Sequence, residues 1–198
     1  MLANPTEAAL STELAEAIDQ ALVYAEASEA KATRKGYAAD LRDFITALGF
    51  RDGRALLHSG NLIFRAPAQA PATIEQRLER EAAARLGLQT DIFVRTAGDL
   101  EALVARNPFT GEAANDPAHL VVAFLRDAPG AAAERALQAK IAGREAVRCD
   151  GRHAYVTYPD GIGESKLTNA VIEKALGTRG TARNWNTVGK LLAAARSS

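Results

Sequence analysis

The loop from residue 160 to residue 166 has residue types that suit an anion. It reads Asp-Gly-Ile-Gly-Glu-Ser-Lys and follows a strand-like stretch. Gly161 and Gly163 allow a close backbone approach, Ser165 supplies a hydroxyl, and Lys166 supplies a positive charge. A helix that begins here would add unpaired N–H groups. The stretch predicts a site for a phosphate-bearing ligand; the alternative is a tight turn in which Ser165 caps the helix.

The spacing of this loop differs from that of the common nucleotide-binding loops. A P-loop has four residues between its glycines and places Lys before Ser or Thr. Here a single residue separates Gly161 from Gly163, and Ser165 precedes Lys166. The pattern G-x-G-x-x-G is not matched either. No cofactor is therefore predicted.

Arg183 and Asn184 form a second polar group farther along the chain, in the stretch TARNWNTV. A guanidinium can bind a phosphate through two hydrogen bonds, and an amide can both donate and accept. We expect these two side chains to close one side of the loop's site if the chain folds back after the intervening helix. The ligand classes that fit are a phosphate-bearing small molecule and a nucleic acid.

Other reaction chemistries lack the residues that they need. The three histidines, His58, His119 and His153, do not have metal-ligand spacing, and Cys149 is the single cysteine. No Gly-x-Ser-x-Gly stretch and no suitable Cys–His pair is present. No metal site is expected, no catalytic residue is predicted, and the question of enzymatic activity stays open.

Composition limits the partners. Lys and Arg together number 24, as do Asp and Glu, so the formal net charge is zero. The chain as a whole therefore has no field that would draw it to nucleic acid or to a membrane. No apolar run reaches the roughly 20 residues of a membrane span. We expect a cytoplasmic protein without a membrane partner, and the oligomeric state stays open.

A local basic cluster is the exception to this neutrality. It could contact DNA phosphates, although a solvated helix surface is the simpler interpretation. Its members are Lys31, Arg34, Lys35 and Arg42.

Helix-like and strand-like stretches alternate along the chain, which predicts an α+β fold. In the second half, the stretches HLVVAFLRD, EAVRCD and HAYVTYP are typical of strands, and Asp150-Gly151 predicts a hairpin between the last two. Helical stretches cover residues 130–142 and 166–176. The order β-α-β-β-α is that of a ferredoxin-like lobe without its last strand. Residues expected to be buried there are Leu120, Val122, Phe124, Val156, Leu167, Ile172 and Leu176.

From about Tyr37 to Arg196 the chain resembles the bacterial family known as domain of unknown function 1697. The stretches FVRTAGDLEALVARNPF and HLVVAFL carry this resemblance, and above all YPDGIGESKLTNAVIEKALGTRGTARNWNTVGKL. It implies a cytosolic α+β protein with two small sheet-based lobes. It implies no activity.

The N-terminal part departs from that family, whose members begin with a strand and a glycine-containing turn. The stretch LVYAEASEAKATRKGYAADLRDF instead resembles the start of a tyrosine recombinase core-binding domain. Two explanations stay open: a fusion or frame error, and a divergent helical extension. We expect residues 1–30 to be helical and the first lobe to lack its first strand. The matching residues are Ser28, Thr33, Arg34, Tyr37, Asp40 and Phe44.

Three parts of the chain are therefore expected. They are a helical extension over 1–36, a truncated first α+β lobe over 37–112, and a second α+β lobe with a C-terminal helix over 113–198. A DNA-binding fragment derived from a recombinase, without recombinase activity, is the alternative to a small-molecule binding module. An enzyme of unknown reaction in the same pocket is a further alternative.

Overall fold

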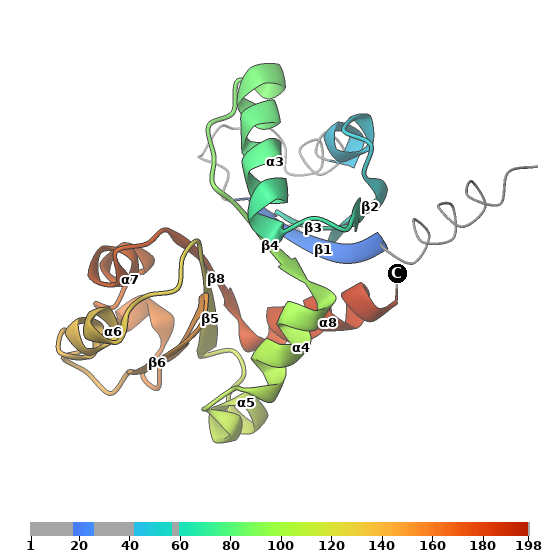
Figure 1. Cartoon of the computed structure of the whole chain (residues 1–198). Coiled ribbons are helices and arrows are strands. Elements are labelled where there is room, and N and C mark those ends of the chain that lie inside the picture. Colours follow the sequence, from blue (N-terminus) through green and yellow to red (C-terminus); the bar gives the residue numbers. More distant parts are fainter. Residues whose placement is uncertain (1–17, 26–41, 57–59, 198) are drawn as a thin grey trace, which may run out of the picture. The chain divides into compact units, whose positions relative to one another are not determined.

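The computed structural model describes residues 18–25, 42–56 and 60–197. The chain divides into two compact units, Met1–Ala97 with Ser197–Ser198 and Gly98–Arg196. Figure 1 labels the elements of both units. The division lies ahead of the expected boundary after residue 112. Because compactness does not test which segments fold alone, the expected domain limits stay a prediction.

The first unit contains a four-stranded antiparallel sheet in the order β2-β3-β1-β4. The strands are β1 (Ile18–Ala25), β2 (Arg51–Leu56), β3 (Asn61–Pro67) and β4 (Ile92–Thr96). A helical turn at 42–47 and helix α3 (Pro71–Leu86) pack on one face of this sheet.

Helix α3 forms where local signals and core packing agree. Pro71 lies in its first turn, where a missing N–H costs nothing. Ile74, Leu78 and Ala82 recur every four residues and pack into the core. The helix ends at Gly87, whose left-handed conformation suits glycine.

Strand β1 contradicts the expected N-terminal helix. Its backbone pairs with β3 from Ile18↔Pro67 to Tyr24↔Asn61, and with β4 from Ala21↔Thr96 to Ala25↔Ile92. The prediction that the first lobe lacks its first strand was wrong. The helix propensity of an Ala-rich stretch amounts to tenths of a kcal/mol per residue, and hydrogen bonding to two neighbouring strands outweighs it. Residues 1–17 and 26–30 of the expected helix lie outside the described ranges.

The second unit has a four-stranded antiparallel sheet in the order β6-β7-β5-β8. Its strands are β5 (Leu120–Leu125), β6 (Ala146–Asp150), β7 (His153–Thr157) and β8 (Gly180–Asn184). Helices α6 (Ala131–Gln138) and α7 (Asn169–Leu176) cover one face. The unit also contains α5 (Thr110–Asn115), α8 (Trp185–Arg196) and all of α4 (Ala97–Ala105) except its first residue. Helix α8 packs on β5 and β8.

The expected core and hairpin of this unit are confirmed. The Asp150-Gly151 turn joins β6 to β7, with Gly151 at a φ of 53° and Asp150 paired with His153. Inward side chains of both strands alternate with those of the opposite face, as a sheet covered on two sides requires. Each residue expected to be buried is at most 5% exposed: Leu120, Val122, Phe124, Val156, Leu167, Ile172 and Leu176.

Strand β8 was not expected. It pairs with β5 from Val121↔Asn184 to Leu125↔Gly180 and completes the ferredoxin-like order β-α-β-β-α-β. Gly180 packs tightly here, because a Cβ atom at this position would lie 2.9 Å from Leu125 Cδ2. The stretch GTARN has few strand-forming residues, so its pairing with β5 rather than its own pattern makes it a strand.

The two sheets share one topology. In each unit the chain runs strand, helix, strand, strand, helix, strand, and the fourth strand lies beside the first. The helical turn at 42–47 takes the place in the first unit that α6 takes in the second. The two units therefore repeat one fold.

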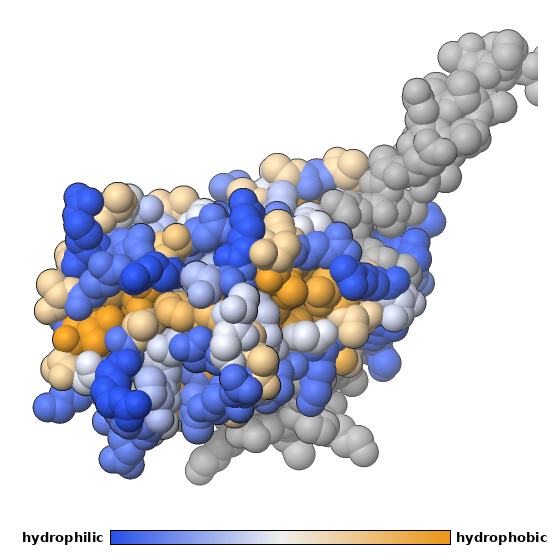
Figure 2. Space-filling model, turned by 90° about the horizontal axis from the view of Figure 1, so that it is seen from below, coloured by the Kyte–Doolittle hydropathy of each residue, from blue (hydrophilic) through white to orange (hydrophobic). Residues whose placement is uncertain are grey.

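Helices of the described residues include none that is long and apolar enough to cross a membrane. The face of the molecule in Figure 2 shows hydrophilic side chains around separate hydrophobic patches. Among the described large hydrophobic residues, Leu86 and Ile162 are the exposed ones, at 49% and 47%.

Candidate functional site

The loop after β7 ends before the next helix begins. Gly161 has a φ of 94° and precedes a short 3-10 helix, Ile162–Glu164. Helix α7 begins only at Asn169, where the Thr168 side chain accepts a hydrogen bond from the Val171 N–H. Its cap is thus Thr168, so the Ser165 cap of the alternative interpretation was wrong, although the turn itself is present with Gly161 at a positive φ. The N–H groups of the 161–166 loop are consequently not those of a helix N-terminus.

Ser165 instead ties this loop to the start of β6. Its hydroxyl donates a short hydrogen bond to Glu145 Oε1 and accepts one from the Leu167 N–H at 3.0 Å. The hydroxyl donor holds the pKa of the Glu145 carboxyl below its usual value. Glu145 is therefore ionised at neutral pH.

Two further contacts fix the loop. The Tyr158 hydroxyl donates to the Leu167 carbonyl at 2.9 Å, and burial raises the pKa of this tyrosine to about 12. Arg144 Nη1 donates to Asp160 Oδ1 at 2.8 Å on the exposed side. The exposed ion pair contributes little stability, so the buried tyrosine is the stronger of the two restraints.

A pocket of about 230 Å³ lies between this loop and the connection from α6 to β6. It contains charges of both signs from the two walls. Over the ranges 18–25, 42–56 and 60–197, neither Lys140 nor Lys166 forms an ion pair, and Glu164 forms none either. The lining residues are Lys140, Ile141, Ala142, Gly143, Glu145, Glu164, Lys166 and Leu167.

Of the expected loop residues, Lys166 lines the pocket and Ser165 supports it through Glu145. Gly161 and Gly163 shape the turn beside it and are not among the lining residues. The structure thus brings only part of the expected set to the cavity.

Arg183 and Asn184 lie elsewhere in the unit, on β8, which β5 separates from β7. Arg183 Nη1 donates to Thr181 Oγ1 at 2.9 Å and to the Ala182 carbonyl at 2.8 Å. Asn184 Oδ1 accepts from the Thr187 N–H at 3.0 Å, which caps the start of α8. Neither residue lines the pocket with Lys166. A role of this pair in binding stays a prediction.

The sequence of the chain matches that of a known protein family. A sequence model described as "Protein of unknown function (DUF1697)" matches residues 30–155, more than half of the chain. The chain belongs to this family. No curated protein matches it.

The fold of this DUF1697 protein is similar to that of a solved bacterial protein. This solved structure is that of the conserved bacterial protein SP0830 from Streptococcus pneumoniae, with a TM-score of 0.68 and 16% identity over 90% of this chain and 99% of that one. A second structure, TA0507, whose name proposes a chlorite dismutase, has 13% identity over 88% of this chain and 99% of that one. Its TM-score of 0.24 carries no argument.

The sequence of this DUF1697 protein did not lead to Lys140 and Glu145, the charged residues of the wall that precedes β6. Lys140 and Glu145 lie on either side of a turn before β6, while the loop follows β7. A hairpin places the start of its first strand beside the end of its second, as the pair Ala146↔Thr157 shows. The Asp150-Gly151 hairpin signal could therefore have brought the two walls together.

Most residues of the alternative DNA site lie outside the ranges that the structure describes. Lys31, Arg34 and Lys35 lie outside the described residues, as does most of the stretch that resembles a recombinase. Arg42 is exposed at the start of the 42–47 helical turn. Contact with DNA stays a prediction.

The remaining reactive side chains have structural partners. Burial and the nearby Glu134 carboxylate raise the pKa of the Cys149 thiol to about 11, so the thiol stays protonated at neutral pH. His119 Nδ1 lies 2.9 Å from Asp116 Oδ2, and His153 is buried against Phe124. Within the described ranges, no group of three or more His, Cys, Asp or Glu side chains could hold a metal ion.

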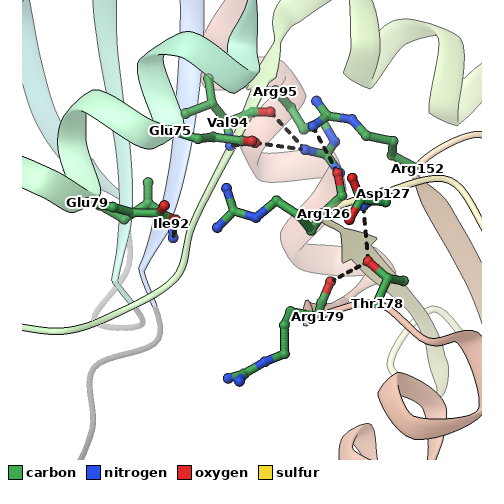
Figure 3. A network of polar contacts seen from close by, with 10 residues as sticks. All are labelled: Glu75, Glu79, Ile92, Val94, Arg95, Arg126, Asp127, Arg152, Thr178 and Arg179. Atoms are coloured by element: carbon green, nitrogen blue, oxygen red, sulfur yellow. Dashed lines mark hydrogen bonds and ion pairs between the residues drawn. The ribbon is translucent and has the colours of Figure 1, made fainter.

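Buried polar contacts in the first unit serve its edge strand β4. Glu75 Oε1 accepts from the Val94 N–H at 2.8 Å, and Glu79 Oε1 accepts from the Ile92 N–H at 2.7 Å. Arg95 Nη1 donates to the Val94 carbonyl at 2.8 Å and lies 3.6 Å from Glu75 Oε1 (Figure 3). The glutamates of α3 thus satisfy the outer N–H groups of this strand.

In the second unit, glutamates of the covering helices also accept hydrogen bonds from the edge strands. Glu173 Oε1 of α7 accepts from the Gly180 N–H of β8 at 2.7 Å, and Glu134 Oε1 of α6 accepts from the Cys149 N–H of β6 at 3.2 Å. Beside β8, the Thr178 hydroxyl accepts from the Asp127 N–H at 3.0 Å (Figure 3). Edge N–H groups that are already bonded cannot pair with another strand.

Proposed function

We propose that the second unit binds a phosphate-bearing small molecule in the pocket between the 140–145 segment and the 164–167 segment. The observation that carries this proposal is the pair of lysines. Lys140 and Lys166 line one small pocket from opposite walls, and neither has an ion-pair partner among the described residues. Two ammonium groups around one cavity favour an anion that contacts both.

The size of the pocket limits the ligand. At about 230 Å³ it lies below the usual range of drug-sized sites, about 300–1,000 Å³. A phosphate monoester with a short organic part fits that volume better than a whole dinucleotide. Ile141 and Leu167 provide apolar contact for the organic part.

The walls of the pocket are held before any ligand arrives. Ser165 links the loop to Glu145, and Tyr158 holds the Leu167 carbonyl at 2.9 Å. A preformed site loses less conformational entropy on binding than a mobile one. Lys166 therefore needs only to order its own side chain.

A thermal-shift measurement with glycerol 3-phosphate tests the proposal, because a ligand of the folded state raises the melting temperature. A charge-assisted contact contributes about 1.5–3 kcal/mol. Lys140→Ala and Lys166→Ala should therefore each weaken binding about ten- to a hundredfold. Lys190→Ala, an exposed lysine of α8 outside the pocket, is the matched control and should leave binding unchanged.

The other outcomes separate the alternatives. Absence of any shift by phosphate esters, or equal binding by Lys166→Ala, would overturn the proposal. A salt-sensitive shift with a short DNA duplex, lost in Arg42→Ala, would favour the DNA-binding alternative. Turnover of a bound phosphate ester would make the pocket that of an enzyme.

A further inference from the structure

The pocket of the second unit contains two carboxylates as well as two lysines. Glu145 lies on the same wall as Lys140, and Glu164 lies on the same wall as Lys166. The four charges come from two segments that meet only because β6 and β7 form a hairpin. Each wall therefore presents one positive and one negative side chain to the same cavity.

Neither carboxylate forms an ion pair with a lysine of the pocket in the part of the chain that the structure describes. Ser165 donates to Glu145 Oε1, which favours the ionised form. Glu164 is exposed and forms no ion pair with any residue in the described part of the chain. A ligand that offered only negative charge would gain from the lysines and lose against both glutamates.

Resting on the proposed function, we infer that the ligand is a phosphorylated amine, with a negative phosphate and a positive ammonium group a few bonds apart. The phosphate lies between Lys140 and Lys166. The ammonium group donates to Glu164, the exposed carboxylate of the pocket, and lies near the negative charge of Glu145, whose Oε1 accepts from Ser165 and whose Oε2 is buried without a hydrogen-bond partner among the described residues. A zwitterion of this kind matches both signs of charge in the pocket, whereas a simple phosphate ester matches one.

Two probes that differ only by an amine test this inference: phosphoethanolamine and ethyl phosphate. Calorimetric titration at neutral pH and equal ionic strength should show phosphoethanolamine binding about tenfold more tightly, the factor expected for one partly exposed charge-assisted contact. Glu164→Gln should remove most of that preference while leaving ethyl phosphate binding equal or tighter. Glu112→Gln, an exposed glutamate of α5 outside the pocket, is the control and should keep the preference.

Gly143→Ala provides a second variant that displaces Glu145 without removing it. A Cβ atom at Gly143 would lie 2.4 Å from Glu145 Oε2, so the Glu145 carboxylate, which Ser165 bonds through Oε1, would have to shift. This variant should fold, as a melting curve by circular dichroism would show. It should weaken phosphoethanolamine binding several-fold more than ethyl phosphate binding.

The outcomes distinguish this inference from the proposed function. Ethyl phosphate binding as tightly as phosphoethanolamine, with both lost in Lys166→Ala, would overturn the zwitterionic ligand and support the phosphate site. No binding of either probe would overturn both. A preference for the amine that survives Glu164→Gln and Gly143→Ala would also overturn the inference, because the glutamates would then not be its cause.

Discussion

At the scale of single residues, Ser165 is the side chain that links the two walls of the candidate pocket. It accepts from the Leu167 N–H and donates to Glu145, so one hydroxyl joins the two walls of the pocket. An Ala at this position would leave the Glu145 carboxylate without its hydroxyl donor. The variant would then lose the hydroxyl link between the two walls, while Glu145 would stay ionised at neutral pH with a pKa nearer to its ordinary value.

We expect Ser165→Ala to raise the pKa of Glu145 toward its ordinary value of 4.5. Because the folded-state pKa is lowered, Glu145 stabilises the fold above its unfolded pKa, and that contribution is lost as the pH falls through the lower folded value. Stability of the variant should thus depend less on pH below about 5. Carboxyl NMR shifts followed from pH 2 to 7 would check the pKa.

Thr168→Ala is the useful comparison for that measurement. Thr168 caps α7, and its loss should cost about 1 kcal/mol of stability at every pH without moving the Glu145 pKa. A Glu145 pKa that is the same in the wild type and in Ser165→Ala would contradict the link between the two walls.

At the scale of elements, the helices that cover the sheets also close their edges. Glu79 of α3 bonds the N–H of Ile92, the first residue of β4, and Glu173 of α7 bonds the N–H of Gly180, the first residue of β8. The same device occurs at the same place in both units. It explains how strands with weak patterns, β8 above all, are held at an edge.

Glu173→Ala should destabilise the second unit by about 1–3 kcal/mol, since it leaves a half-buried N–H without its acceptor. Urea unfolding followed by circular dichroism would measure this loss. Lys174→Ala, on the exposed side of the same helix, should change stability by less than about 0.5 kcal/mol. Equal effects of the two changes would show that the bond to Gly180 adds nothing.

At the scale of the whole molecule, one topology occurs twice in this DUF1697 protein. Each unit places its fourth strand beside its first and its third beside its second. The loop between the third strand and the following helix differs between them. It runs from Pro67 to Pro71 in the first unit and from Thr157 to Asn169 in the second. The candidate pocket lies beside the longer loop, and loops held by a rigid scaffold are common places for binding residues.

We expect the second unit, Gly98–Arg196, to fold without the first. Every strand of its sheet pairs with another strand of the same unit. Its core includes residues from these strands and from α6 and α7. Near the two ends of the segment, Arg196 Nε donates to Glu101 Oε1 at 2.8 Å. A chain of about 100 residues is long enough for an independent core. Cooperative thermal unfolding of this segment would confirm the prediction, and a sloping, non-cooperative melt would contradict it.

Much of the second unit was predictable because its signals are local. The run from Leu120 to Leu125 is continuously apolar, as a strand buried on both faces requires. The Asp150-Gly151 turn needs a residue that tolerates a positive φ, and Gly151 is that residue. For the candidate site, Lys166 was found from its loop, whereas Lys140 was not, since only the packed hairpin brings it near.

The sequence by itself determined the α+β class, the hairpin, the buried strand β5 and the polar loop after β7, because periodicity and turn residues act within a few positions. Only the tertiary structure decided that Ile18–Ala25 and Gly180–Asn184 are strands, since each forms by pairing with strands distant in sequence. It also decided that Lys166 lines one pocket with Lys140, Glu145 and Glu164, and not with Arg183. Strand pairing and pocket lining depend on which distant segments pack together. A weak local preference for helix or coil is outweighed there by the hydrogen bonds and packing that the neighbouring strand provides.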